Sequence, residues 1–201
     1  MIEAKEVVRL MRHQLNDFDE TKFSDYDVLQ ALNQTLRQLS VSLANKGAQV
    51  LEVSEDYDEA EMNEDPEAVV DFTNDGVKLP DDCASIISVQ DTAHGEKLQP
   101  ATSRLQLAEH GYRMYYVAGD RIFTKVDAFR LNYYRALAEL TSLDETIDLP
   151  RIFLDPLVKI TRVVLENGEN DVMTQTVTTE LNRVLPRRRY SNSRVRMPFY
   201  V

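Results

Sequence analysis

The chain has 201 residues, a length that suits one domain or a domain with extensions. Apolar residues make up 43% of it, and no stretch approaches the ~20 apolar residues needed to cross a bilayer. The single cysteine, Cys83, excludes an intrachain disulfide and a thiolate metal cluster. The net charge is −11, yet six arginines and no acid follow from Arg183 onward, which leaves about −17 on the first 182 residues. Such an acidic body disfavours tight binding of duplex DNA, because phosphate contacts require Lys and Arg.

The amino-terminal segment predicts two helices joined by a short polar connection. Apolar residues recur at three- and four-residue steps in 2–17 and again in 25–45. Ser24 and Asp27 form a variant of the capping box at the start of the second helix. We expect these two helices to pack as an antiparallel hairpin. The opening residues are charged throughout and lack the apolar stretch of a signal peptide, so cytoplasmic synthesis is expected.

The middle of the chain predicts a small antiparallel β insertion, at about 68–137. The acidic run at 54–67 precedes it and is interpreted as an exposed or mobile loop of open function. Short β-rich runs separated by turn residues then follow: 69–73, 77–79, 84–90, 114–117, 121–126 and 129–135. The last of these alternates strictly between apolar and polar residues, apart from Tyr134. A short helix is expected at 102–110.

The last third predicts two more helices, within about 155–184, followed by a tail. Asp155 and Pro156 suit the cap and first position of the first helix. Pro186 ends the second helix, and 186–201 has no periodicity. The predicted fold class is therefore α+β: residues 1–185 form a single domain, a helical bundle with a β insertion, and 186–201 form an extended basic arm.

The sequence contains no recognisable catalytic constellation, so we expect no enzyme activity and no cofactor. Phosphate-loop, dinucleotide and nucleophile-elbow patterns are all missing. His13, His94 and His110 lack ligand-like spacing and are interpreted as surface or capping residues. Asp17, Asp19 and Asp25 lack the glycine and glutamate of a calcium loop and are interpreted as a solvated connection.

Two further groups of residues are interpreted as structural. Acidic neighbours raise the pKa of Cys83, which favours a packing role. The tyrosine pairs 115–116 and 133–134 are expected to place one ring in the core and one on the surface, although stacking on single strands is the alternative.

The arm is the candidate binding site. Its arginines alternate with aromatic and other apolar residues of the types enriched at protein interfaces. A disordered basic tail is the competing interpretation of this composition, but a docked arm is favoured. The predicted contact residues to a neighbouring subunit or another partner are Arg187, Arg188, Arg189, Tyr190, Arg194, Arg196, Met197, Phe199, Tyr200 and Val201.

The order of several short motifs resembles the head–tail connector (adaptor) proteins of tailed bacteriophages. The motifs are Leu15-Asn16-Asp17, Ser24-Asp25, Leu32-Asn33, Val77-Lys78-Leu79-Pro80, Ile86-Ile87-Ser88-Val89, Arg121-Ile122-Phe123, Leu131-Asn132-Tyr133-Tyr134 and Ile147-Asp148-Leu149-Pro150. The resemblance covers about residues 5–170. Two features depart from the family pattern: Phe23 stands where the family often has Trp, and the 54–67 segment has no counterpart.

The resemblance implies a structural protein of the virion, at the head–tail junction. Its copies would form a ring, usually of twelve, that extends the DNA channel, binds the portal protein through the C-terminal arm and meets a tail or nozzle protein. Double-stranded DNA would pass through without sequence-specific binding, as an acidic lumen allows, and no membrane would be involved.

Two alternatives stay open at this stage. The first is a nucleic-acid-binding module that uses the arginine-rich tail. The second, ranked far lower, is a hydrolase with an unrecognised carboxylate pair.

Overall fold

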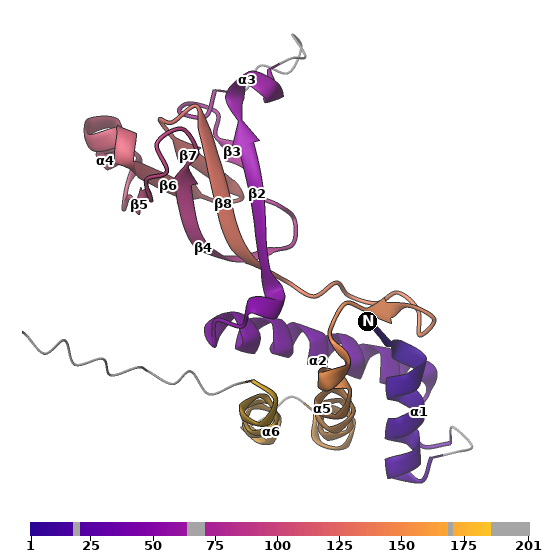
Figure 1. The fold of residues 1–201 in the computed structure, drawn as a ribbon. Helices are drawn as coiled ribbons and strands as arrows, with labels where there is room; N and C mark the ends of the chain where they lie inside the picture. Colours follow the sequence, from indigo (N-terminus) through magenta and orange to yellow (C-terminus); the bar gives the residue numbers. More distant parts are fainter. Residues whose placement is uncertain (18–20, 64–70, 169–170, 186–201) are drawn as a thin grey trace, which may run out of the picture.

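The computed structural model describes residues 1–17, 21–63, 71–168 and 171–185, with two separate hydrophobic cores. The first core belongs to a helical unit, built from the chain up to residue 51 and from residue 136 onward. The second belongs to a β unit, built from residues 52–135. The two units lie end to end, and strands run from one to the other (Figure 1). The fold mixes helices with sheets, as the α+β prediction requires.

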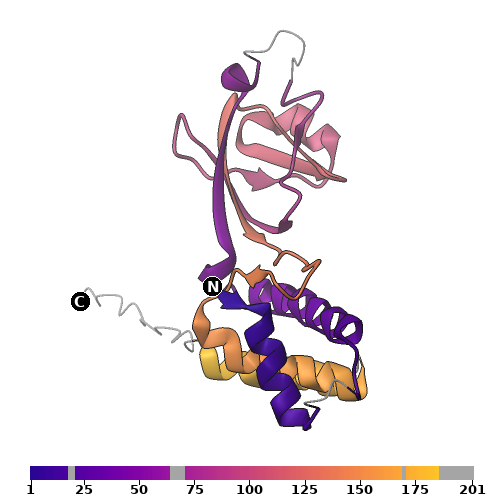
Figure 2. The ribbon, with the colours of Figure 1, turned by 90° about the vertical axis from the view of Figure 1, so that its right-hand side faces the viewer.

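Helix α5 is the centre of the helical unit. It spans Leu154–Asn167 and packs against α1 (Ala4–Leu15), α2 (Asp25–Asn45) and α6 (Asp171–Val184). Helices α1 and α6 lie on opposite sides of α5, beneath α2 (Figure 1). The predicted antiparallel hairpin of 2–17 and 25–45 does not hold in that form. The apolar stripe of α1 packs on α5 instead, and α1 lies across α5 (Figure 2).

Two helix starts differ from the prediction because tertiary contacts decide them. Ile2 and Glu3 form strand β1, which pairs with β9 (Thr146–Ile147), so α1 begins only at Ala4. Helix α5 begins at Leu154, after a 3₁₀ turn at Arg151–Phe153, so Pro156 lies in the first helical turn and not at the first position. Proline is tolerated there because the first turn has no intrahelical acceptors for its N–H groups.

The β unit contains a three-stranded and a four-stranded sheet. The first has the order β2 (Glu52–Asp58), β8 (Ala128–Arg135), β4 (Cys83–Asp91), all antiparallel. The second has the order β3 (Val77–Lys78), β7 (Arg121–Thr124), β6 (Met114–Ala118), β5 (Gln99–Pro100), in which β5 and β6 are parallel. Helix α4 (Arg104–His110) precedes β6. The alternating side chains of β8 bury Phe129, Leu131 and Tyr133, as predicted.

The acidic segment corrects two predictions. Residues 54–58 are not a loop but belong to strand β2, which pairs with β8 along its full length, and 59–62 form the short helix α3 (Glu59–Met62). The β unit therefore begins at Glu52 and not near residue 68. Arg130 stabilises the strand by binding Asp56 through hydrogen bonds of 2.7 and 2.8 Å. Residues 64–67 lie outside the described part.

The predicted strand 69–73 is only partly within the described residues, and 71–73 form a turn in place of a strand. The Asp71 carboxylate accepts hydrogen bonds from the backbone N–H groups of Thr73 and Asn74, at 2.7 and 3.0 Å. These bonds stabilise the turn. Phe72 lies in this turn and is buried in the β core.

Helix α2 also holds the segment that returns from the β unit. The Asn33 amide donates to the carbonyl of Leu140 at 2.9 Å and accepts from its N–H at 2.8 Å. The Ser40 hydroxyl accepts from the N–H of Leu137 at 2.9 Å. These buried polar side chains satisfy backbone groups that would otherwise lack partners in the core. The segment 137–140 is thereby fixed on α2.

Candidate interaction site on the first two helices

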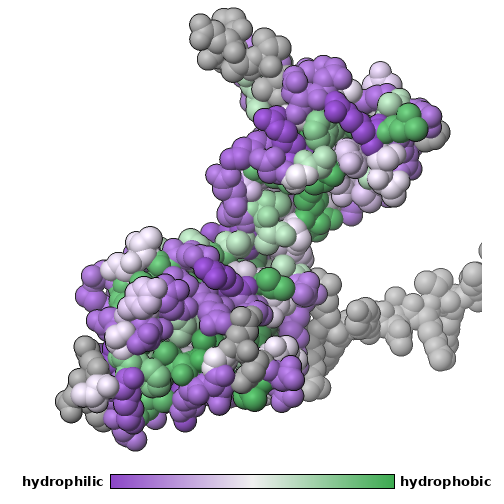
Figure 3. Space-filling model, turned by 180° about the vertical axis from the view of Figure 1, so that it is seen from behind, coloured by the Kyte–Doolittle hydropathy of each residue, from purple (hydrophilic) through white to green (hydrophobic). Residues whose placement is uncertain are grey.

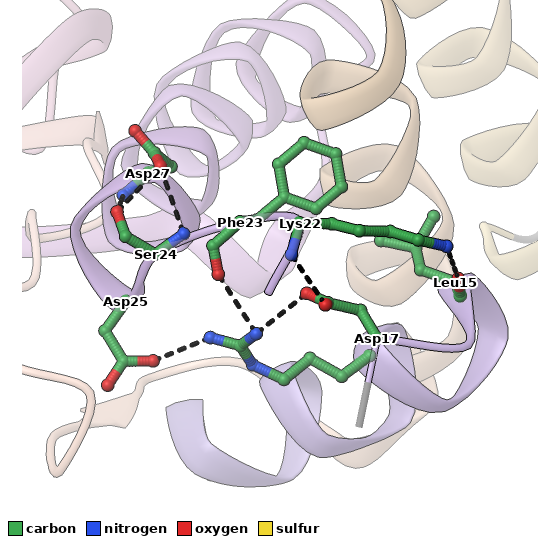
Figure 4. Close-up of polar contacts among 8 residues, drawn as sticks. Leu15, Asp17, Lys22, Phe23, Ser24, Asp25 and Asp27 are labelled. Atoms are coloured by element: carbon green, nitrogen blue, oxygen red, sulfur yellow. Dashed lines mark hydrogen bonds and ion pairs between the residues drawn. The ribbon is translucent and has the colours of Figure 1, made fainter. Parts of the chain in front are cut away.

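A buried arginine joins the end of α1 to the start of α2. Arg12 donates to the carboxylates of Asp17 and Asp25, at 2.9 and 2.8 Å, and to the carbonyl of Phe23 at 3.1 Å (Figure 4). Its side chain is 8% exposed. Asp17 is also buried, so the prediction of a solvated connection is wrong for this residue. Its carboxylate is placed there because Arg12 compensates the charge.

Backbone groups of the connection also bind Asp17. Its other carboxylate oxygen accepts from the N–H of Lys22 at 2.9 Å (Figure 4). This hydrogen bond is the main reason that the pKa of Asp17 is lowered, with Arg12 contributing in the same direction. The connection is thus folded around one carboxylate, and Asn16 reverses the chain with a φ of 51°.

The capping box predicted at the start of α2 is present. The N–H of Asp27 donates to the Ser24 hydroxyl at 3.2 Å, and the N–H of Ser24 donates to the Asp27 carboxylate at 3.1 Å. The Ser24 hydroxyl also donates to that carboxylate, at 2.6 Å, and lowers its pKa. Together with Arg12, this box fixes the direction in which α2 leaves the connection.

Next to this corner lies an open groove of about 650 Å³, between α1, the start of α2 and residues 142–144. The apolar side chains that line it are Val8, Tyr26, Leu29 and Leu143. Tyr26 is 69% exposed, although it is a large aromatic residue. Exposed aromatic residues beside arginines are typical of protein interfaces. The sequence did not single out this groove, because three separate segments form it.

Two of the three Lys and Arg side chains that line the groove form ion pairs with carboxylates. Lys5 binds Asp144, and Arg12 binds Asp25. Arg9 also lines the groove, and within the described residues no ion pair to it is present. The groove therefore offers a cation beside an apolar floor, on an otherwise acidic chain.

The face of the molecule opposite to that of Figure 1 is mostly polar, with apolar patches on the helical unit and between the two units (Figure 3). No helix of the described residues is both long and apolar enough to span a membrane. Within the same residues, no group of three or more His, Cys, Asp or Glu side chains could hold a metal ion.

The predicted binding arm, 186–201, lies outside the described residues. Its ten candidate contact residues, from Arg187 to Val201, therefore stay a prediction. Asp19 of the rejected calcium loop is outside as well. Neither Asp17 nor Asp25 is left for a cation, because both bind Arg12.

The other residues considered from the sequence have structural surroundings. Cys83 packs against the β core, and burial, followed by the neighbouring Asp82, raises its pKa as predicted. His13 and His94 are exposed, and His94 Nδ1 lies 2.7 Å from the Asp91 carboxylate.

The tyrosine pairs follow the prediction only in part. Tyr133 is buried in the β core, and burial together with hydrogen bonds to Glu55 and Asp82 raises its pKa. Tyr134 packs against the helical core and does not lie free on the surface. Tyr115 packs on the β core, and the ring of Tyr116 lies 6.2 Å from that of Phe123.

A comparison with known protein families identifies the family of this chain. The family model described as SU10 adaptor protein matches residues 3–198. The chain belongs to the SU10 adaptor protein family. A comparison with curated proteins found no match.

As an SU10 adaptor, the chain has a structural role in a phage and is a component of the virion that associates with other head or tail components. The family is not a class of enzymes. The resemblance to head–tail connectors is thereby confirmed. The matched range includes residues 186–198 and the acidic segment 54–67.

Proposed function

We propose that this adaptor forms a ring of twelve copies, which binds the portal protein through the arm 186–201 and extends the DNA channel toward the tail. The observation that carries the proposal is the family match over nearly the whole chain, together with the separation of charge between body and arm.

The described part of the adaptor supports a conduit that does not hold DNA. Most of its cations are already bound to carboxylates of the same chain, so few remain for phosphate. The ion-paired residues are Lys5, Arg12, Arg37, Lys78, Arg113, Arg130, Arg135, Arg151, Lys159, Arg162 and Arg183. Exposed acids such as Glu52 and Glu61 add a repulsive field.

The arm 186–201 is basic, in contrast to the acidic remainder of the chain. Five of the six arginines from Arg183 onward fall within 186–201, which contains no acid. Arginine binds carboxylates in a bidentate manner, and aromatic side chains such as Phe199 and Tyr200 are effective anchors in apolar pockets. We infer that Arg187, Arg188 and Arg189 contact carboxylates of the portal or of an adjacent subunit. Docking of the arm carries a cost in conformational entropy that the binding energy must exceed.

The test is a chain that ends at Leu185, mixed with purified portal particles and examined by electron microscopy. We expect an intact fold, no attachment to the portal and, in the phage, DNA-filled heads without tails. A version with Arg187, Arg188 and Arg189 changed to Glu should fail in the same way. The control carries three changes to Glu at exposed positions of the β unit, Lys78→Glu, Lys97→Glu and Arg113→Glu, and should attach normally.

Normal tailed virions assembled from the truncated chain would contradict the docking role of the arm. Tight, salt-sensitive binding of duplex DNA by the full chain, lost on truncation, would favour the nucleic-acid-binding alternative.

A further inference from the structure

The groove beside Arg12 and the outer face of α6 have complementary chemistry. We propose that the groove receives the start of α6 of a second copy, with Val172 on its apolar floor and Asp171 against Arg9. This inference rests on the proposed ring, and it names the surfaces through which neighbouring subunits meet.

The groove has the composition of a binding surface for an acidic and apolar partner. Its floor is formed by Val8, Leu29 and Leu143, and the exposed Tyr26 stands at its edge. Lys5 is paired with Asp144 and Arg12 with Asp17 and Asp25, whereas Arg9 has no ion pair within the described residues. Arg9 is therefore the cation of the groove that can pair with a carboxylate of another copy.

The beginning of α6 offers the matching groups. Val172 is 49% exposed, although it is apolar, and it follows the exposed Asp171. No ion pair to Asp171 is present within residues 1–17, 21–63, 71–168 and 171–185. The next exposed residues of α6 are neutral: Thr174, Gln175, Thr178 and Thr179. They add no second charge that would oppose Arg9.

The positions of these two surfaces suit a ring. Helices α1 and α6 lie on opposite sides of α5, so the groove and the α6 face belong to opposite flanks of the helical unit (Figure 1). A contact between two different surfaces is heterologous, and such contacts form a ring when the rotation from one copy to the next closes. A single copy cannot satisfy the contact itself, because α5 separates the two flanks.

A charge exchange tests the contact. The variants Arg9→Asp and Asp171→Arg should each reduce ring assembly at least tenfold, measured by sedimentation and electron microscopy with portal particles present. The double variant Arg9→Asp/Asp171→Arg should restore the rings, because the attraction is recovered with the charges exchanged. Lys97→Asp, at an exposed site in the β unit, is the control and should assemble normally.

Cross-linking gives an independent measurement. With Cys83→Ser as background, the pair Tyr26→Cys/Val172→Cys should form disulfides between copies under oxidising conditions, whereas Tyr112→Cys/Val172→Cys should not. Tyr112 is 77% exposed but belongs to the β unit. Circular dichroism checks that every variant is folded.

Several results would overturn the assignment. Rings that persist in Arg9→Asp, or a double variant that fails to recover them, refute this groove as the contact while leaving the proposed ring intact. Rings that form in Arg9→Asp but no longer bind the portal assign the groove to the portal. A wild-type chain that forms no ring with portal particles refutes both proposals.

Discussion

Replacing Arg12 by Met should destabilise the helical unit far more than removing an ion pair at the surface. Arg12 makes three hydrogen bonds and is 8% exposed. Breaking a buried charge pair by removing one partner costs about 3–5 kcal/mol, because the other charge stays buried without compensation. Methionine keeps the unbranched apolar stem, so most of the packing is preserved.

The matched control is Arg37→Met. Arg37 binds Glu139 with two hydrogen bonds, of 2.7 and 2.9 Å, but the two side chains are 61% and 54% exposed. Such exposed pairs contribute about 0.2–1 kcal/mol. Both variants remove an arginine that is hydrogen-bonded to a carboxylate, but the carboxylate left behind is buried at Asp17 and exposed at Glu139.

Urea unfolding followed by far-ultraviolet circular dichroism measures the difference. With a denaturant slope of about 2 kcal/mol per M, the midpoint should fall by about 2 M in Arg12→Met and by about 0.5 M or less in Arg37→Met. Adding Asp17→Asn to Arg12→Met should recover part of the loss, because the neutral amide still accepts from Lys22. Equal midpoints in the two single variants would refute the buried-charge reasoning.

Two further predictions concern α2. Leu32 is fully buried, so Leu32→Asp should unfold the helical unit by burying an unpaired charge. Gln30→Asp, on the exposed face of the same helix, is the control and should remain folded. A soluble, folded Leu32→Asp protein would contradict the assigned core. Because the Ser24 hydroxyl lowers the pKa of Asp27, the folded state binds fewer protons there, and the stabilisation is full above the unfolded pKa of about 3.9 and lost as the pH falls through the folded pKa. The stability difference between wild type and Asp27→Asn in urea titrations should therefore shrink below about pH 4, and a difference independent of pH would exclude the carboxylate as its source.

Features set by local sequence could be predicted. Helix α2 has the predicted bounds because its capping box and apolar stripe are local signals. The β6–β7 hairpin was predicted from its turn residues, and Ala118 pairs with Arg121 across them. Strand β8 was recognised from alternation, since one of its faces is buried.

Features set by distant partners could not be predicted. Strand β2 has four acids, which favour a loop in isolation, and becomes a strand only because β8 provides hydrogen bonds and Arg130. The packing of α1 on α5 depends on residues about 150 positions apart. The groove beside Arg12 was missed for the same reason, whereas the arm 186–201 stands out in the sequence by its charge and stays a prediction.

The division of the helical unit by the β unit has a consequence for synthesis. Helix α2 emerges from the ribosome long before α5 and α6, against which it buries Leu32, Leu36 and Leu39. The β unit is continuous in sequence and can fold as soon as β8 has emerged. During translation of about 100 residues, the apolar stripes of α1 and α2 therefore lack their partner. We expect the nascent chain to be a chaperone client in this interval, and slow translation before residue 154 to increase aggregation.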